Sequence, residues 1–208
     1  LDRYELAAKL LEQALESAIT NFEPAHPVVA VNQSNLALVY KDLGRYESAA
    51  ELLEQALESD LANFGPAHPV VAARQSNLAT VYQDLGRYES ATELLEQALE
   101  SDLTNFGPAH PVVAVNQSNL ATVYQDLGRY ESAAELLEQA LESNLTNLGQ
   151  DHPTVAVSQS NLAIVYINIG REKDAIALLQ SAQAIFEASL GVNHPNTKGV
   201  QSWLDKYQ

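Results

Sequence analysis

The sequence predicts an all-α protein, a right-handed α-solenoid of stacked antiparallel helix hairpins that repeats every 42 residues. Three observations support this fold class. His-Pro occurs five times, always 42 residues apart. Within each interval apolar residues follow helical spacing, and alanine and leucine dominate over β-branched runs. Because one hairpin cannot bury both of its faces, repeated hairpins must stack and share a core.

Two further motifs keep the same period. Asn-Leu-Ala begins at Asn35, Asn77, Asn119 and Asn161, and Gly-Arg begins at Gly44, Gly86, Gly128 and Gly170. Blocks 44–85 and 86–127 differ at only four positions. We therefore predict a single array over 1–208. Its repeats run approximately over 1–43 (starting at the second helix), 44–85, 86–127, 128–169 and 170–208 (with a truncated last helix).

The segment after each His-Pro predicts the first helix of a hairpin. In the third block Leu120, Val123 and Leu127 lie on one apolar face. Pro111 suits the first helical turn, where its missing N–H costs nothing. Gly128 follows as a stop, because glycine tolerates the left-handed conformation that ends helices.

The second helix is expected from about Arg129. Its apolar face contains Tyr130, Ala133, Leu136, Leu137, Ala140 and Leu141. Its exposed ridge contains Glu131, Glu135, Glu138 and Glu142. A solvated surface is the usual meaning of such a ridge, and recruitment of calcium or of a basic partner is the alternative.

The stretch NFGPAHPVVA, at 63–72 and again at 105–114, poses the choice between a metal site and a joint. Zinc needs its ligands about 2.1 Å from one ion, whereas equivalent residues of stacked helices lie at least about 8–10 Å apart. The histidines therefore predict a structural connection between the second helix of one hairpin and the first helix of the next, with Pro as the first residue of the new helix. We call this connection the joint. No metal or other cofactor is expected.

An arginine also recurs, at Arg45, Arg87, Arg129 and Arg171. It could bind an anion. We favour pairing with a neighbouring carboxylate, such as Asp84 or Asp126, around the turn between the helices.

The pattern Leu78-Ala79-x2-Tyr82…Gly86…Ala91-x3-Leu95…Ala98 resembles the tetratricopeptide repeat signature. Alanine replaces the usual glycine after the leucine, and the usual proline after the second helix is absent. The 42-residue pattern LG-x-x-HP-x-VA…NLA-x-x-Y…G-x-Y resembles kinesin-light-chain repeats and related prokaryotic arrays of high identity. The resemblance covers essentially the whole chain, and it implies a peptide or partner helix bound along the concave face of the first helices.

Opposite its apolar face, each first helix carries a second stripe. Its candidate binding residues are Ser76, Asn77, Thr80, Gln83 and Asp84, then Ser118, Asn119, Thr122, Gln125 and Asp126, with Asn35 and Asn161 at the matching asparagine position. By the resemblance, the four asparagines form an amide ladder facing the groove. An amide offers two donors and an acceptor, which suits a peptide backbone. The alternative is that these amides satisfy the groove's own polar groups.

The charge of the stripe narrows the expected ligand. Relatives that clamp a C-terminal carboxylate place Lys or Arg at the first stripe position, but here Val31, Ala73, Val115 and Val157 occupy it. Arg74 is the one nearby cation, and Asp42, Asp84 and Asp126 lie at the far end. We expect a neutral or basic peptide.

Composition excludes several other functions. The net charge of −16 argues against nucleic acid and anionic membranes as partners. No run approaches the roughly 20 apolar residues that span a bilayer. Near-identical repeats provide no singular constellation for catalysis, so we predict that the chain is not an enzyme. A cytoplasmic location is the default expectation.

The ends depart from the repeat. In the helix expected at 1–22, Leu6 replaces a serine and Lys9 a glutamate, which predicts end-to-end self-association through this N-terminal edge or docking of another domain. In the truncated helix at 196–208, Trp203 occupies the asparagine register.

The sequence as a whole predicts a protein–protein interaction scaffold. Two alternatives remain open: a repeat sensor or regulatory segment of a larger signalling protein such as an NTPase, and an array without a dedicated ligand.

Overall fold

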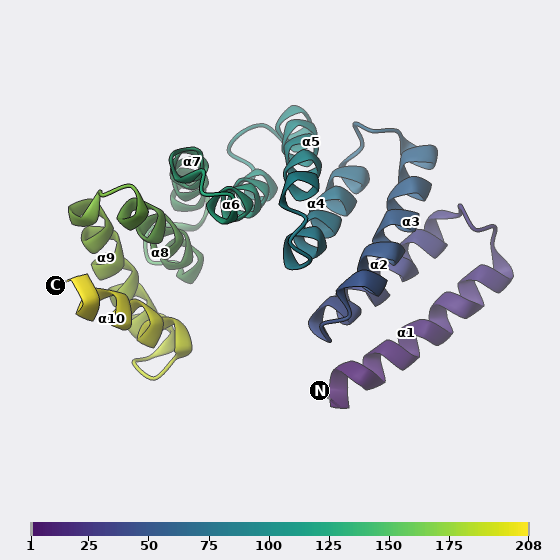
Figure 1. The fold of residues 1–208 in the computed structure, drawn as a ribbon, viewed down its shortest axis with the longest axis horizontal. Coiled ribbons are helices and arrows are strands. Elements are labelled where there is room, and N and C mark those ends of the chain that lie inside the picture. Colours follow the sequence, from purple (N-terminus) through teal and green to yellow (C-terminus); the bar gives the residue numbers. More distant parts are fainter. Residues whose placement is uncertain (1, 208) are drawn as a thin grey trace. The chain divides into compact units, whose positions relative to one another are not determined.

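The computed structural model describes residues 2–207, and within this range it contains ten α-helices and no β-strand. The first helices of the hairpins are α2 (Pro27–Asp42), α4 (Pro69–Asp84), α6 (Pro111–Asp126), α8 (Pro153–Asn168) and α10 (Pro195–Tyr207). The second helices are α1 (Asp2–Asn21), α3 (Tyr46–Phe64), α5 (Tyr88–Phe106), α7 (Tyr130–Leu148) and α9 (Glu172–Leu190). The all-α hairpin fold and its 42-residue period are confirmed (Figure 1).

The chain forms two compact halves, Leu1–Asn105 and Phe106–Gln208. In the N-terminal half α1 packs on α2, α2 on α3 and α3 on α4. In the C-terminal half α6 packs on α7, and α7, α8, α9 and α10 follow one another in the same way. Helix α2 also contacts α4, so these two first helices are neighbours.

Each described first helix begins at the same histidine cap. In α4 the backbone N–H of Val70 donates to Nδ1 of His68 at 3.2 Å, and Pro69 is the first helical residue. The Phe64 ring stacks on the His68 ring with a centroid separation of 4.8 Å. The other four histidines accept the same bond, at His26, His110, His152 and His194. The prediction of a joint is confirmed.

Helices α2, α4, α6 and α8 end in a Schellman motif, for which α4 is the example. Arg87 N–H donates to the Tyr82 carbonyl at 2.8 Å, and Gly86 N–H donates to the Gln83 carbonyl at 2.9 Å. Gly86 has φ +72°, a conformation that costs an L-residue about 1–2 kcal/mol. A glycine at this position therefore ends the helix without strain.

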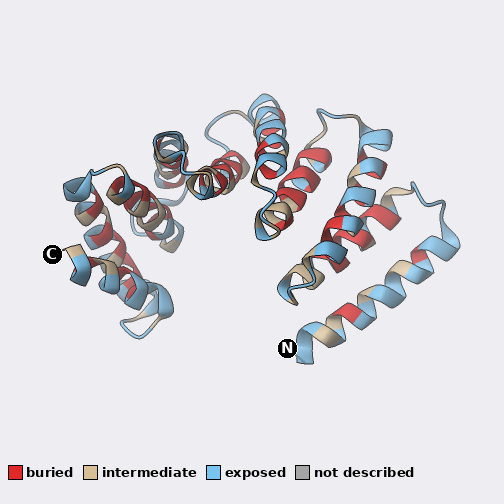
Figure 2. Cartoon of the chain, viewed as in Figure 1, coloured by how far each residue is buried: buried red, intermediate tan, exposed pale blue. Residues whose placement is uncertain are grey.

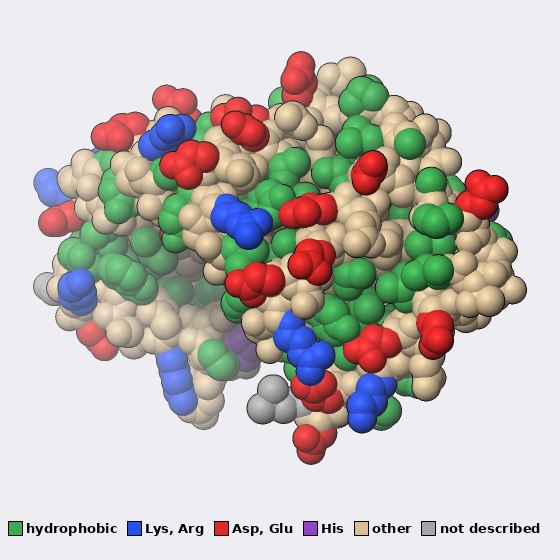
Figure 3. Space-filling view, turned by 45° about the vertical axis from the view of Figure 1, so that its right-hand side comes forward, with side chains coloured by type: hydrophobic (Ala, Val, Ile, Leu, Met, Phe, Trp, Pro, Cys, Tyr) green, Lys and Arg blue, Asp and Glu red, His purple; other side chains and the backbone are tan. Residues whose placement is uncertain are grey.

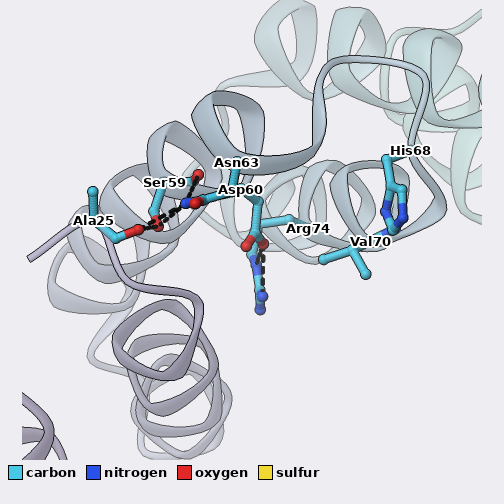
Figure 4. Close-up of polar contacts among 7 residues, drawn as sticks. All are labelled: Ala25, Ser59, Asp60, Asn63, His68, Val70 and Arg74. Carbon is cyan, nitrogen blue, oxygen red and sulfur yellow. Dashed lines mark hydrogen bonds and ion pairs between the residues drawn. The ribbon is translucent and has the colours of Figure 1, made fainter. Parts of the chain in front are cut away.

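Side chains of the second helices hold the preceding joint. Ser59 Oγ and Asn63 Nδ2 both donate to the carbonyl of Ala25, at 2.8 and 2.7 Å (Figure 4). One repeat later Ser101 and Asn105 donate to the Ala67 carbonyl in the same way. The joint is therefore fixed to the next hairpin as well as to its own.

Each half has its own apolar core. Leu53 and Leu78 are central in the N-terminal half, and Leu137, Leu179 and Phe186 in the C-terminal half. Buried residues form one side of most helices in Figure 2, whereas α1 is largely exposed. Only Ala8 and Ala18 of α1 are buried.

One buried polar position differs from repeat to repeat. Arg74 of α4 and Asp60 of α3 form an ion pair at 2.8 Å, with side chains 9% and 2% exposed (Figure 4). At the equivalent position of the C-terminal half, Asn144 donates to Ser158 at 2.9 Å. A charged pair and a neutral pair thus fill the same place between a second helix and the following first helix.

Candidate peptide-binding groove

The four predicted ladder asparagines occur at one position of successive first helices. Asn35 on α2 is exposed, and Asn77, Asn119 and Asn161 are half-buried. Within the part of the chain that the structure describes, the side-chain amides of Asn35, Asn77 and Asn161 make no hydrogen bond. These amides therefore keep their donors and acceptors for an external partner.

The hydroxyl groups of the stripe behave differently. Thr80 donates to the Asn77 carbonyl, Ser118 to the Ala114 carbonyl and Thr122 to the Ser118 carbonyl, each at 2.9 Å. Ser76 is buried. Gln125 Nε2 donates to the Ala121 carbonyl at 3.4 Å, and Gln83 is half-buried. Because these hydroxyl protons are used by the helices themselves, the amides of Asn35, Asn77 and Asn161 are the donors of the stripe that stay available to a ligand.

In the C-terminal half the stripe lines a cavity of about 220 Å³. Its polar and apolar lining comes from α8, α9 and α10: Val157, Ser160, Asn161, Ile164, Leu179, Phe186, Asn196, Gly199, Val200 and Trp203. Asn161 and Trp203 occupy the same register of α8 and α10, as predicted, and both reach this cavity. An amide, an indole and aliphatic side chains therefore surround this cavity, which we call the recess.

Charged residues near the stripe depart from two predictions. Arg74 is not a groove cation, because its guanidinium is buried against Asp60. Asp84 does not pair with a repeated arginine, because Lys41 of α2 lies 3.5 Å from its carboxylate. Arg74 and Asp84 each pair with a residue of another helix, and the sequence of a single repeat does not indicate such pairs. Asp42 and Asp126 are exposed at the same end of their helices.

The repeated arginines lie against tyrosine rings. Arg45 and Arg87 are 5.4 Å from the ring centroids of Tyr40 and Tyr82. Arg45 also pairs with Glu5 of α1 at 2.9 Å. The predicted carboxylate partner thus exists for Arg45, but it belongs to the preceding second helix and not to the turn.

Arg171 contacts a tyrosine ring and two carboxylates. Its guanidinium lies 3.8 Å from the Tyr166 ring centroid, 2.8 Å from the Asp174 carboxylate and 3.3 Å from the Glu138 carboxylate. The hydrogen bond that Arg171 Nε donates to the Asp174 carboxylate is the main cause that raises the pKa of Arg171.

Tyrosine–glutamate hydrogen bonds were not foreseen from the sequence. Tyr40 donates to Glu12, Tyr82 to Glu54 and Tyr166 to Glu138, always across 28 residues. Burial, and then the glutamate partner, raise the pKa of each hydroxyl, to about 12 for Tyr166. The shared 42-residue period of Tyr and Glu was the available signal.

The described residues contain no group of three or more His, Asp or Glu side chains that could hold a metal ion. Among the helices of residues 2–207, none combines the length and the apolar character needed to cross a bilayer.

Comparison with known proteins places these repeats in a family. The tetratricopeptide repeat model matches residues 1–62, 70–145 and 113–188. No curated protein sequence matches significantly.

Solved structures of repeat proteins have a similar fold. The structure of a Podospora anserina putative kinesin light chain with nearly identical repeats is 32% identical, with 90% of this chain and 89% of that chain covered and a TM-score of 0.77. BtubC (BKLC) from P. vanneervenii is 28% identical, with coverage of 93% and 76% and a TM-score of 0.79. MamA, at 16% identity and a TM-score of 0.63, shares the fold. The chain belongs to the tetratricopeptide repeat family, and its 42-residue repeats are of the kinesin-light-chain-like class.

Proposed function

We propose that the chain is a non-enzymatic scaffold that binds an extended peptide or a partner helix along the stripe of the first helices. Tetratricopeptide repeats generally mediate protein–protein interactions, which supports the class of function. The observation that carries the proposal is that the side-chain amides of Asn35, Asn77 and Asn161 are at least partly exposed and make no hydrogen bond within the described residues. A cytoplasmic location and the lack of catalytic activity stay predictions.

The ladder suits a peptide backbone because backbone groups recur along a ligand as the asparagines recur along the array. The recess beside Asn161 and Trp203 would take an apolar side chain of the same ligand. The net charge of −16 favours a neutral or basic ligand over an acidic one.

Trp203, the single tryptophan, provides the test. Tryptophan emission is titrated with peptides of equal length that differ only in carrying Lys, Ser or Glu between apolar residues. The Lys or Ser peptide is expected to shift the emission at a lower concentration than the Glu peptide. Tighter binding of the Glu peptide, strengthened at low salt, would contradict the proposed charge preference.

A matched pair of variants tests the ladder itself. Asn161→Ala removes one amide from the recess and is expected to weaken binding about tenfold, the equivalent of one buried hydrogen bond of about 1.4 kcal/mol. Gln180→Ala removes an exposed amide from α9 outside the recess and should leave binding unchanged. Equal affinities for the two variants would refute the role of the asparagines.

We also propose that the N-terminal edge self-associates. Leu6 and Leu10 on α1 are 60% and 58% exposed, and Tyr4 is 47% exposed. Sedimentation velocity across a concentration series should show a reversible dimer that Leu6→Glu with Leu10→Glu abolishes. A strict monomer at high concentration would exclude self-association.

A further inference from the structure

Three places in the described part of the chain show the same cleft between successive second helices, on the side of the hairpins away from the stripe. It lies between α1 and α3 over α2, between α3 and α5 over α4, and between α7 and α9 over α8. The volumes are about 520, 440 and 460 Å³, respectively. We name these three the outer clefts. Their volumes fall within the range of about 300–1,000 Å³ that is typical of ligand sites.

Each outer cleft has an apolar floor. Between α3 and α5 the floor is formed by Leu78 and Tyr82 of α4, with Leu57, Leu61 and Leu94 as walls. Leu61 is 38% exposed, so apolar surface is accessible to a ligand. The other two clefts have leucine or isoleucine at the wall positions and Leu–Tyr at the floor.

All charged residues that line the outer clefts are acidic. They are Glu12, Glu16 and Glu51 in the first cleft, Glu54, Glu58 and Glu93 in the second, and Glu138, Glu142 and Asp174 in the third. Carboxylates stand beside apolar side chains on the face that Figure 3 presents. A ligand that places cations over the rims and an apolar side chain over the floor would complement both features.

The protein itself shows that the rim accepts a guanidinium. In the third cleft Arg171 lies over the Tyr166 ring and contacts Glu138 and Asp174, which both line the cleft. In the second cleft Arg87 lies farther from the tyrosine ring, at 5.4 Å. Cation–π and carboxylate contacts therefore coexist at one edge.

We propose that the outer clefts are a second, repeated docking surface for a basic amphipathic helix, with one leucine-sized side chain in each occupied cleft and Lys or Arg against its glutamates. The surface is separate from the stripe of the first helices, so a ligand there does not compete with a peptide bound beside Trp203. Adjacent clefts share helix α3, so a ligand with two such segments would gain avidity.

The experiment uses the full chain and a synthetic helical peptide of Leu and Lys with leucines on one face. Binding is measured by isothermal titration calorimetry, and Trp203 emission is recorded in parallel. A Ser-for-Leu peptide and a Glu-for-Lys peptide serve as ligand controls.

Two triple variants of equal net charge separate the clefts from general electrostatics. The cleft variant changes one rim residue of each cleft, with Glu16→Lys, Glu58→Lys and Glu142→Lys. The control variant changes three exposed glutamates that line none of the three clefts, with Glu47→Lys, Glu89→Lys and Glu131→Lys. Circular dichroism verifies that both variants remain folded.

The proposal expects at least tenfold weaker binding of the Leu–Lys peptide to the cleft variant, less than twofold weakening for the control variant, and unchanged Trp203 emission. Equal weakening of both variants, or tight binding of the Ser-for-Leu peptide, would show unspecific charge attraction and overturn it. A shift of Trp203 emission with no effect of the cleft variant would assign this ligand to the stripe. That outcome overturns the outer clefts and leaves the proposed function intact.

Discussion

At the residue scale, near-identical repeats are distinguished by a few buried polar pairs. Arg74 with Asp60 and Asn144 with Ser158 fill the same position with different chemistry. A shifted pairing of hairpins would bring a charged member against a neutral one, and an unpaired buried charge costs several kcal/mol. We infer that these pairs help to fix which hairpins stack together.

Arg74→Ala should therefore destabilise the protein strongly, because it leaves the Asp60 carboxylate buried without its partner. The expected loss is about 3–5 kcal/mol in the free energy of unfolding, measured by urea denaturation. The double variant Asp60→Asn with Arg74→Ser copies the Asn144–Ser158 pair and should recover most of the loss. A single variant as stable as the parent would show that the ion pair contributes little.

At the scale of the helix, local signals determine where each element begins and ends. His caps each first helix and Pro is its first residue, and Gly86 at positive φ is part of the Schellman motif that ends α4. Within the described residues, the helix expected at 1–22 ends at Asn21, and the helix expected at 196–208 begins at Pro195. Both differences are of one residue because helix ends depend on the last hydrogen bond, and the expected ends at positions 1 and 208 lie outside the described residues.

Two glycines should respond in opposite directions to the same substitution. Gly86→Ala should destabilise by about 1–2 kcal/mol, because φ is +72° and no atom lies within 4 Å of the added Cβ, so only the backbone opposes it. Gly199 lies within helix α10, also with open space, and Gly199→Ala should stabilise by about 0.5–1 kcal/mol. Thermal unfolding of both variants tests the contrast, and a loss of stability in both would contradict it.

At the scale of the whole molecule, repetition multiplies small effects. Each tyrosine–glutamate bond joins a first helix to the second helix of the previous hairpin, and three of them recur at one register. Stability in such arrays is approximately a sum of repeat and interface contributions. The contributions of these tyrosine–glutamate bonds to the free energy of unfolding are therefore expected to add up along the chain.

The raised tyrosine pKa values predict alkaline sensitivity. The pKa of Tyr166 rises from 10.0 to about 12 on folding, so the folded state holds this proton more tightly. The resulting stability is fully present below pH 10 and is lost as the pH rises through 12. Tyr166→Phe cannot ionise here and should show a shallower decline of melting temperature between pH 9 and pH 12. Parallel curves for variant and parent would exclude this contribution.

The sequence by itself determined the period, the helix boundaries to within about a residue, and the register of Asn161 and Trp203, because caps, glycine turns and helical spacing act within a few residues. The tertiary structure alone decided which side chains meet between helices: Lys41 with Asp84, Arg74 with Asp60, and tyrosine with the glutamate 28 residues before it. The outer clefts, too, depend on the tertiary structure, because they lie between second helices of successive hairpins. These features depend on how neighbouring helices are offset and inclined, and packing of many side chains sets that geometry, not any local pattern.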